Sequence, residues 1–200
     1  MIDRYIYPLQ ARLLQPAAQA LARRGVSANA VSAIGFVIGL AALPLLALRQ
    51  YELALVAILA NRLLDGLDGA IARCSRPTER GAFIDIAFDF LFYASVPLGF
   101  ALADPAANAV ATAVLLFGFM GTASSFLSFS AVAARKGLTA DSYPTKGIYY
   151  LGGLTEGAET IAFFVAMCLW PAAFATLAYI FAVLCAITTL MRWWWGWRSL

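Results

Sequence analysis

Four aspartates form two pairs at helical spacing within a hydrophobic part of the chain. Asp65 and Asp68 lie three residues apart, and Asp85 and Asp89 lie four apart, so each pair shares one face if the segments are helical. Four neighbouring carboxylates cannot all stay ionised without cations, and a ligand set made only of oxygen suits Mg²⁺ or Mn²⁺ better than zinc. The excess of negative charge therefore calls for protonation or for a divalent metal ion.

Small residues surround the first pair of acids. Gly66, Gly69, Ala70 and Ala72 leave that helix face nearly bare beside Asp68, and bare backbone lets a ligand approach closely. A metal ion with open positions commonly takes substrate phosphates. The site is therefore interpreted as one that binds a diphosphate.

The rest of the sequence places these acids in a membrane. The chain has 200 residues, is 62% hydrophobic and 12% charged, and has a mean hydropathy of +0.80, which indicates a one-domain integral membrane protein. No strand-like alternation is present, so we predict an all-α integral membrane protein with six transmembrane helices in one bundle. The segments long enough to span a bilayer lie near 28–48, 52–72, 82–102, 108–133, 154–170 and 172–191.

Two of these predicted helices, 52–72 and 82–102, carry the acids and run antiparallel. If Arg73 and Gly81 mark their ends on one side, the two aspartate pairs lie at matching depths, about 6 to 12 Å into the helices. The four carboxylates then converge close to one membrane surface. Arg62 and Arg73, which lie beside them, can neutralise at most part of their charge.

Basic residues gather on one side of the predicted bundle. The opposite turns contain only Arg49, so the positive-inside rule places both termini and the active site in the cytoplasm; the compact chain suggests a bacterial inner membrane. The net charge of +3 is attributed to an anionic leaflet, and nucleic acid is not an expected partner. The basic residues on the cytoplasmic side are Arg4, Arg12, Arg23, Arg24, Arg73, Arg76, Arg80, Arg135, Lys136, Lys146, Arg192 and Arg198.

The N-terminal segment differs from the apolar segments that follow it. Over residues 1–24, apolar side chains recur at helical spacing opposite charged ones, which predicts a cytoplasmic amphipathic helix at the membrane interface. Pro8 and Pro16 are expected to break this helix. The transmembrane domain is expected over 25–200.

Two further patterns limit the possible chemistry and assembly. The chain contains no histidine, and its three cysteines have no CxxC spacing, which excludes histidine catalysis and cysteine/histidine metal sites. Gly35 and Gly39 form a GxxxG pattern in the first predicted span. This pattern marks close helix packing, either within the bundle or across a homodimer.

The acids and their neighbours follow the spacing Asp65-x2-Asp68-Gly69-x2-Ala72-Arg73-x7-Gly81-x3-Asp85-x3-Asp89. This pattern resembles the signature of the CDP-alcohol phosphotransferases, whose six-helix architecture with an N-terminal interfacial helix is similar to the predicted topology. Seven residues separate Arg73 and Gly81, where many members have eight. The loop over the nucleotide is therefore expected to be shorter.

The resemblance implies roles for individual residues. Asp65, Asp68 and Asp85 would hold two divalent ions, Mg²⁺ or Mn²⁺, and Asp89 would lie near these ions and act as the catalytic base. The family's N-terminal Pro-Asn-x-x-Thr element has a weaker counterpart in residues 28–32, which keeps the asparagine and a hydroxyl but lacks the proline. The residues that would bind the nucleotide are Asn29, Asp68, Gly69, Ala72, Arg73 and Gly81.

The resemblance also implies a reaction. A phosphatidyl group would move from CDP-diacylglycerol to a small hydroxylated acceptor, with release of CMP, in phospholipid biosynthesis. Two alternatives stay open: transfer of a head group from a soluble CDP-alcohol to a lipid hydroxyl, and metal or proton transport through the intramembrane acids. The fixed spacing between the small residues and the acids favours phosphotransfer over transport, because transport does not require small residues at these positions.

A second pair of acids indicates where the acceptor is bound. Glu156 and Glu159 lie three apart at the start of the fifth predicted span, and a structural role for them is as well supported as acceptor binding. In the inositol-phosphate branch of the family, arginines are expected where this chain has Gly157 and Thr160, so an acceptor without phosphate, such as an amino alcohol, is a live hypothesis. Arg192 is either an acceptor ligand or a cytoplasmic anchor. The candidate acceptor-binding residues are Glu156, Glu159, Lys146 and Arg192.

Overall fold

A computed structural model of the protein describes residues 3–75, 78–136 and 152–200, with side chains from residue 10 onward. The described residues contain helices and no strand, which confirms the all-α prediction. The helices are α1 (Asp3–Arg23), α2 (Ala28–Leu40), α3 (Ala42–Ala47), α4 (Tyr51–Cys74), α5 (Glu79–Ala103), α6 (Pro105–Arg135), α7 (Gly157–Leu169), the 3₁₀ turn η1 (Pro171–Ala173) and α8 (Phe174–Ser199).

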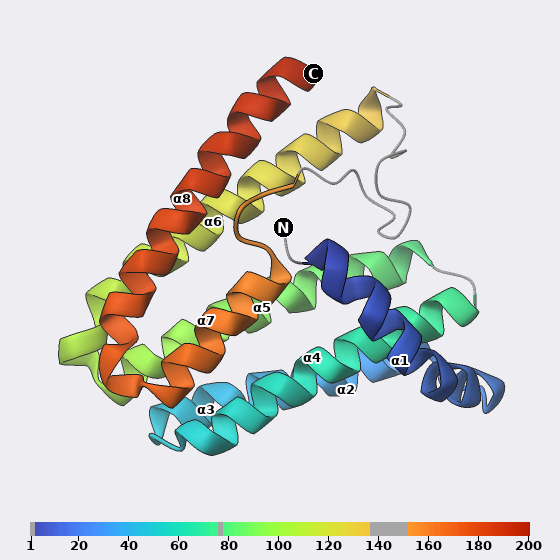
Figure 1. Cartoon of the computed structure of the whole chain (residues 1–200), viewed down its shortest axis with the longest axis horizontal. Coiled ribbons are helices and arrows are strands. Elements are labelled where there is room, and N and C mark those ends of the chain that lie inside the picture. The colour runs from blue at the N-terminus through green and yellow to red at the C-terminus, as the bar shows by residue number, and fades with distance from the viewer. Residues whose placement is uncertain (1–2, 76–77, 137–151) are drawn as a thin grey trace.

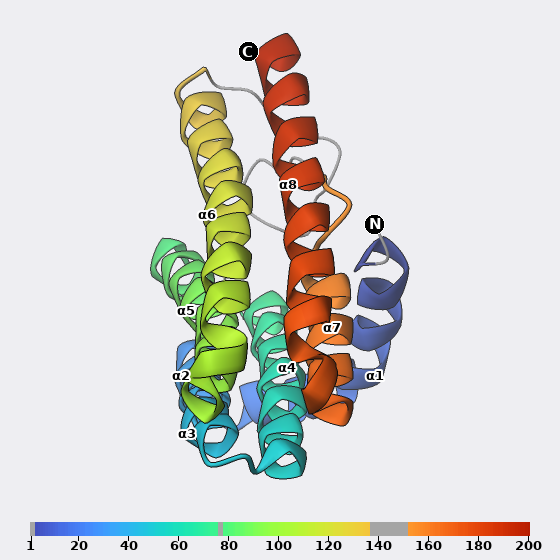
Figure 2. The same ribbon diagram turned by 90° about the vertical axis from the view of Figure 1, so that its left-hand side faces the viewer.

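The helices form one bundle in which α6 and α8 run side by side (Figure 1). α2 packs against α4 and α5, α3 packs against α5, and α1 crosses the outer side of α4. Figure 2 shows the α3–α4, α5–α6 and α7–α8 connections at one end of the bundle, and the C-terminal ends of α6 and α8 at the other. The helices joined by these connections therefore run in opposite directions, as predicted for the two that carry the acids.

Within the part of the chain that the structure describes, four helical segments are long and apolar enough to cross a membrane: Ala28–Ala47, α5, α6 and Pro171–Ser199. α4 falls outside this group because each of its 18-residue windows contains at least three charged residues. α7 has 13 residues, or about 20 Å of helix, which is shorter than the roughly 30 Å core of a bilayer. The chain is an integral membrane protein, and six as the number of spans stays a prediction.

The first predicted span is divided into α2 and α3 near Ala41. Pro44 has no N–H group and cannot bond to the carbonyl of Leu40, the residue four positions earlier. Two hydrogen bonds from the Ala41 N–H, to the carbonyls of Val37 and Ile38, close α2 at this point. The proline therefore marks where the helix is interrupted.

In α1, by contrast, the proline prediction is wrong, because the helix is continuous over Asp3–Arg23. Pro16 is exposed, and so is Arg12, whose carbonyl loses its usual helical partner; on an exposed face this carbonyl can bond to water or lipid head groups. Ala18 is fully buried, so the opposite face of α1 packs on the bundle. Its placement at the membrane interface stays a prediction.

The GxxxG pair is used within the chain. A Cβ atom at Gly35 would lie 3.0 Å from Leu64 Cβ, and one at Gly39 would lie 2.7 Å from the Asn61 amide nitrogen. Both glycines therefore allow α2 to approach α4 closely. This packing explains the pattern without a second subunit.

Arg49, the one basic residue in the opposite turns, links the α3–α4 turn to the C-terminal end of α5. Its Nε and one Nη donate to the carbonyl of Ala103 at 3.2 and 2.9 Å. This carbonyl belongs to the last turn of α5, where helical partners are missing. The Asp104 carboxylate is 4.0 Å away and both side chains are largely exposed, so this ion pair adds little.

We expect Arg49→Met to lower the free energy of unfolding by about 1 kcal/mol, or the Tm by roughly 2 to 4 °C, because the α5 carbonyl loses both donors. The measurement is thermal unfolding in detergent, with Arg24→Met as the control for loss of an exposed arginine. An unchanged Tm for Arg49→Met would show that water replaces the guanidinium at no cost.

Candidate active site

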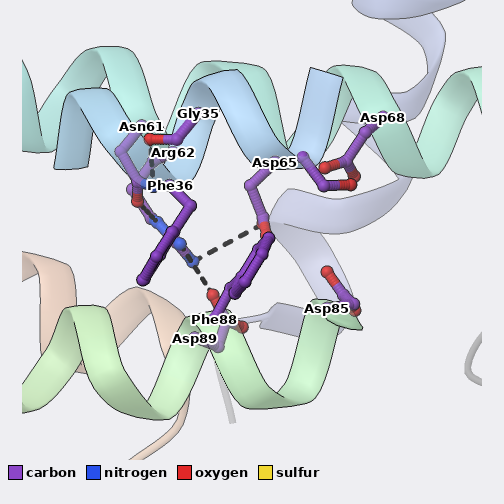
Figure 3. A pocket seen from close by; sticks show the side chains of 10 residues that line it. Gly35, Phe36, Asn61, Arg62, Asp65, Asp68, Asp85, Phe88 and Asp89 are labelled. Carbon is purple, nitrogen blue, oxygen red and sulfur yellow. Dashed lines mark hydrogen bonds and ion pairs between the residues drawn. The ribbon is translucent and has the colours of Figure 1, made fainter. Parts of the chain in front are cut away.

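The four aspartates meet in a cleft between α4 and α5. Asp65 and Asp68 project from α4, and Asp85 and Asp89 project from α5 toward them (Figure 3). α2 packs against both helices and contributes to the cleft lining. The antiparallel course of α4 and α5 therefore brings two sequence-distant pairs to one place, as their spacing predicts.

Three of the carboxylates form a compact group of oxygen ligands. Asp65, Asp68 and Asp85 each place one oxygen so that these atoms lie within 4.8 Å of one another. Asp68 is 6% exposed, whereas Asp85 is exposed, so the group extends from the interior to the open side of the cleft. An arrangement of carboxylate oxygens around one point fits Mg²⁺ or Mn²⁺.

Asp89 has a different principal partner. Its Oδ1 accepts a hydrogen bond from Arg62 Nη2 at 2.7 Å, while the other guanidinium nitrogen, Nη1, lies 3.5 Å from Asp65 Oδ2. Arg62 lies three residues before Asp65, on the same face of α4. The face shared by Arg62, Asp65 and Asp68 was visible in the sequence, but nothing there showed that Arg62 reaches Asp89 on α5.

Several cleft residues were not predicted from the spacing of the acids, and some of them come from α2, outside the acidic segment. Phe36 of α2 stacks on Phe88 of α5 with ring centroids 4.1 Å apart and planes 7° apart, and this pair forms an apolar wall beside the acids. Ser32 lies beside Asp68, and Asn61 lines the cleft next to Arg62.

Apart from Asn29 on α2, the residues expected to bind the nucleotide lie within five residues of Asp68 or Asp85 along the chain. A Cβ atom at Gly81 would lie 3.1 Å from Asn29 Oδ1, so the asparagine of α2 touches the start of α5. A Cβ atom at Gly69 would lie 3.4 Å from an Arg73 nitrogen, and Ala72 is half-buried on the same helix. The glycines thus leave room beside two polar side chains.

The two glutamates of the acceptor prediction cap α7. Gly153 N–H donates to Glu156 Oε1 at 3.0 Å, and Glu156 N–H donates to Glu159 Oε2 at 3.1 Å. Glu156 also accepts from the backbone N–H of Glu159, which completes a capping box. The helix therefore begins at Gly157, three residues later than the predicted span.

Arg192 is buried, with 8% exposure, which does not fit a simple surface anchor. Its Nη1 donates to the Thr122 carbonyl of α6 at 2.9 Å, and a Cβ atom at Gly153 would lie 3.3 Å from its Nε and Nη2. Arg192 therefore joins α6, α8 and the segment before α7. Lys146, the remaining acceptor candidate, lies outside the described residues.

The described residues thus form an all-helical bundle in which three carboxylates converge and a fourth is paired with an arginine, an arrangement suited to a divalent metal ion in a membrane enzyme. A family model described as CDP-alcohol phosphatidyltransferase matches residues 25–197. The chain belongs to this family and is an enzyme of the CDP-alcohol phosphatidyltransferase class.

Individual relatives agree with this assignment. The chain is 52% identical to the inner membrane protein YnjF of Escherichia coli (strain K12) over 200 residues, which cover 100% of this chain and 97% of that protein. It is 35% identical over 98 residues to an archaetidylinositol phosphate synthase of Pyrococcus horikoshii, covering 48% of this chain and 52% of that protein.

A solved structure shows the same fold. The phosphatidylinositol phosphate synthase of Mycobacterium tuberculosis, in a crystal structure with CDP-DAG bound, superposes with a TM-score of 0.72 at 25% identity, over 93% of this chain and 94% of that one. A second structure of that synthase, in complex with manganese and citrate, has the same TM-score at 24% identity, over 92% of this chain and 88% of that one.

Proposed function

We propose that the protein transfers a phosphatidyl group from CDP-diacylglycerol to a small hydroxylated acceptor and releases CMP, in a reaction that depends on a divalent metal ion. The observation that carries this proposal is the group of three carboxylates within 4.8 Å of one another, in a cleft that also contains Asp89. Membership of the transferase family favours this activity over metal or proton transport.

Asp65, Asp68 and Asp85 are the proposed metal ligands, for one or two ions of Mg²⁺ or Mn²⁺, with Asp89 close by. Their donor atoms are all carboxylate oxygens, which is the chemistry that these ions prefer. When bound, such ions would offset the charge of a diphosphate and of the phosphoryl group in transfer. The small side chains beside Asp68 leave space for that diphosphate.

The proposed reaction is a displacement at phosphorus. The acceptor oxygen forms a bond to the phosphorus of the phosphatidyl group, and the bond from that phosphorus to the bridging oxygen of CMP breaks. Asp89 takes the proton of the acceptor hydroxyl, and CMP leaves with the bridging oxygen. The side chains of the cleft supply in-line positioning and charge stabilisation, which are the main requirements of phosphoryl transfer.

The donor is proposed from two lines of support. The structural relative with CDP-DAG bound has a similar fold along nearly its whole length, and the acids of this chain lie in helices of a membrane protein, where a lipid-linked donor is available. Asn29, Gly69, Ala72, Arg73 and Gly81 are the proposed nucleotide-binding residues.

The orientation in the membrane is proposed from charge. The C-terminal ends of α6 and α8, where Arg135 and Arg198 lie, are at the end of the bundle opposite the α3–α4 turn (Figure 2). The positive-inside rule then places this end, both termini and the open side of the cleft in the cytoplasm. An inner membrane location agrees with the name of the Escherichia coli relative. Homodimer formation stays a prediction.

The test is an assay of CMP release by the purified protein in lipid nanodiscs. Mg²⁺ or Mn²⁺, CDP-diacylglycerol and a panel of small alcohols are supplied, and a parallel arm combines soluble CDP-alcohols with a lipid hydroxyl acceptor. CMP release in the first arm alone supports phosphatidyl transfer. Release only in the second arm would mean that a soluble CDP-alcohol is the donor and a lipid hydroxyl is the acceptor. Release in neither arm would overturn the proposed function.

The acceptor is proposed to bind near the start of α7, where Glu159 caps the helix. We expect Glu159→Gln to raise the KM of the acceptor more than that of the donor if the charge of Glu159 binds an acceptor cation. Glutamine can still accept the bond from the Glu156 N–H, so the capping box is kept. Steady-state kinetics with each substrate varied in turn makes the comparison, and an unchanged acceptor KM would leave Glu159 with its capping role only.

A further inference from the structure

Arg62 is a charged residue inside the cleft that lies outside the family signature running from Asp65 to Asp89. Its side chain is 17% exposed, and it lies between the aspartates of α4 and α5 (Figure 3). Keeping a guanidinium in a membrane helix is costly unless the group is paired and has a function. The contacts of Arg62 show which aspartate it binds most closely.

The distances separate a principal partner from a secondary one. Nη2 to Asp89 Oδ1 is 2.7 Å, the length of a strong charge-assisted hydrogen bond. Nη1 to Asp65 Oδ2 is 3.5 Å, at the limit of a hydrogen bond. Asp89 is therefore the residue that Arg62 holds most closely, while the oxygens of the three other aspartates approach one another.

Several other side chains hold the guanidinium group of Arg62 in place. Nε donates to Asn61 Oδ1 at 2.8 Å and Nη1 donates to the Tyr93 hydroxyl at 3.1 Å. The guanidinium carbon of Arg62, Cζ, also lies over the rings of Phe92 and Tyr93, at 4.9 and 5.3 Å from their centroids. An arginine with so many contacts has few alternative rotamers, so it can define the position of its partner.

Asn61 extends this chain of contacts to α2. The asparagine is 4% exposed, and its Nδ2 donates to the Gly35 carbonyl at 2.9 Å. The absence of a side chain at Gly39 makes room for Asn61 at this crossing. A continuous series of hydrogen bonds therefore runs from the α2 backbone through Asn61 and Arg62 to the Asp89 carboxylate.

We propose that Arg62 is a positioning residue that orients Asp89 for proton transfer from the acceptor hydroxyl. The bond from Nη2 occupies one carboxylate oxygen, Oδ1, and turns the second oxygen toward the reacting groups. This role rests on the proposed function, since Asp89 acts as base only in that reaction. It predicts that loss of Arg62 affects the turnover step and not the binding of metal or donor.

The experiment compares Arg62→Met, Arg62→Lys and the control Arg49→Met, which removes an arginine from the opposite end of the bundle. For Arg62→Met we expect kcat of CMP release to fall about 10- to 100-fold, as for other residues that hold a reacting group in place. Arg62→Lys, which can still donate to Asp89, should retain several-fold more activity than Arg62→Met. Arg49→Met should keep the wild-type kcat.

Binding measurements separate positioning from a general structural role. Mn²⁺ affinity, titrated by electron paramagnetic resonance without substrates, and the donor KM should stay within about threefold of wild type in Arg62→Met, because no metal ligand is removed and the 3.5 Å contact of Arg62 with Asp65 is at the limit of a hydrogen bond. A loss of Mn²⁺ affinity of tenfold or more would overturn the proposal, since Arg62 would then be needed to build the metal site itself.

A double-variant cycle tests whether Arg62 acts through Asp89. In the Asp89→Asn background, Arg62→Met should lower CMP release by less than about twofold further, because both changes remove one function. Multiplicative losses, or a single Arg62→Met variant with wild-type kcat, would overturn the role of Arg62 alone. A wild-type protein that releases no CMP from any substrate pair would overturn the proposed function and this role with it.

Discussion

Asp89→Asn is expected to lower the rate of CMP release by about 10²- to 10⁴-fold, while metal and CDP-lipid still bind. The amide oxygen of asparagine can accept the bond that Arg62 Nη2 makes to Asp89 at 2.7 Å, so the shape of the cleft is kept. The amide cannot take the proton of the acceptor hydroxyl. Single-turnover CMP release in nanodiscs measures the loss, and equilibrium binding of CDP-diacylglycerol with Mn²⁺ measures what remains.

A matched control comes from another aspartate of the chain. Asp104 caps α6, where its Oδ1 accepts from the Ala107 N–H at 3.1 Å, and it lies in the turn at the far end of the bundle from the cleft opening. Asp104→Asn keeps an oxygen for this cap and should keep wild-type turnover. If Asp89→Asn were as active as this control, Asp89 would not be the base.

The sequence predicts the helices and the convergence of the acids because both depend on local periodicity. An apolar stretch of sufficient length forms a helix in lipid, and acids three or four apart share a helix face. Pro44 and Pro16 show a limit of prediction from local sequence. Pro44 coincides with the break between α2 and α3, whereas Pro16 lies inside the continuous α1 and Pro97 lies inside the continuous α5, so a proline by itself does not fix where a helix ends.

Contacts between helices cannot be predicted from local periodicity. The stacking of Phe36 on Phe88 and the series from Gly35 through Asn61 to Arg62 depend on how α2 crosses α4 and α5. The GxxxG pattern indicates a close helix crossing but does not identify the partner helix. The partner becomes clear only when Leu64 and Asn61 of α4 are seen against the glycines.

The acceptor side illustrates a competition between two roles of the same residue type. Glu156 and Glu159 have the spacing of a ligand pair and also of a capping box. The hydrogen bonds to Gly153 and Glu156 N–H groups show that the capping role is present, while any acceptor contact stays a proposal. Spacing alone could not rank them, because a capping box and a pair of ligands both use polar side chains three residues apart.

Asp68→Asn is expected to weaken metal and donor binding together, in contrast to Asp89→Asn. Asp68 is 6% exposed and supplies one of the three oxygens that lie within 4.8 Å of one another. Loss of a residue that only supports a metal ligand lowers metal affinity about 10- to 100-fold, so loss of a ligand should cost at least about 100-fold. Mn²⁺ titration, followed by CDP-diacylglycerol binding at a fixed Mn²⁺ concentration, measures both effects.

If metal affinity and donor affinity fall together, the metal ion holds the donor. Wild-type protein in EDTA should lose donor affinity to the same extent as Asp68→Asn, because each removes the cation that the diphosphate contacts. Asp104→Asn, which leaves the cleft unchanged, should bind Mn²⁺ and donor as the wild type does. If Asp68→Asn bound Mn²⁺ normally but lost the donor, Asp68 would contact the nucleotide directly; if it kept both, the three-carboxylate group would not be the metal site.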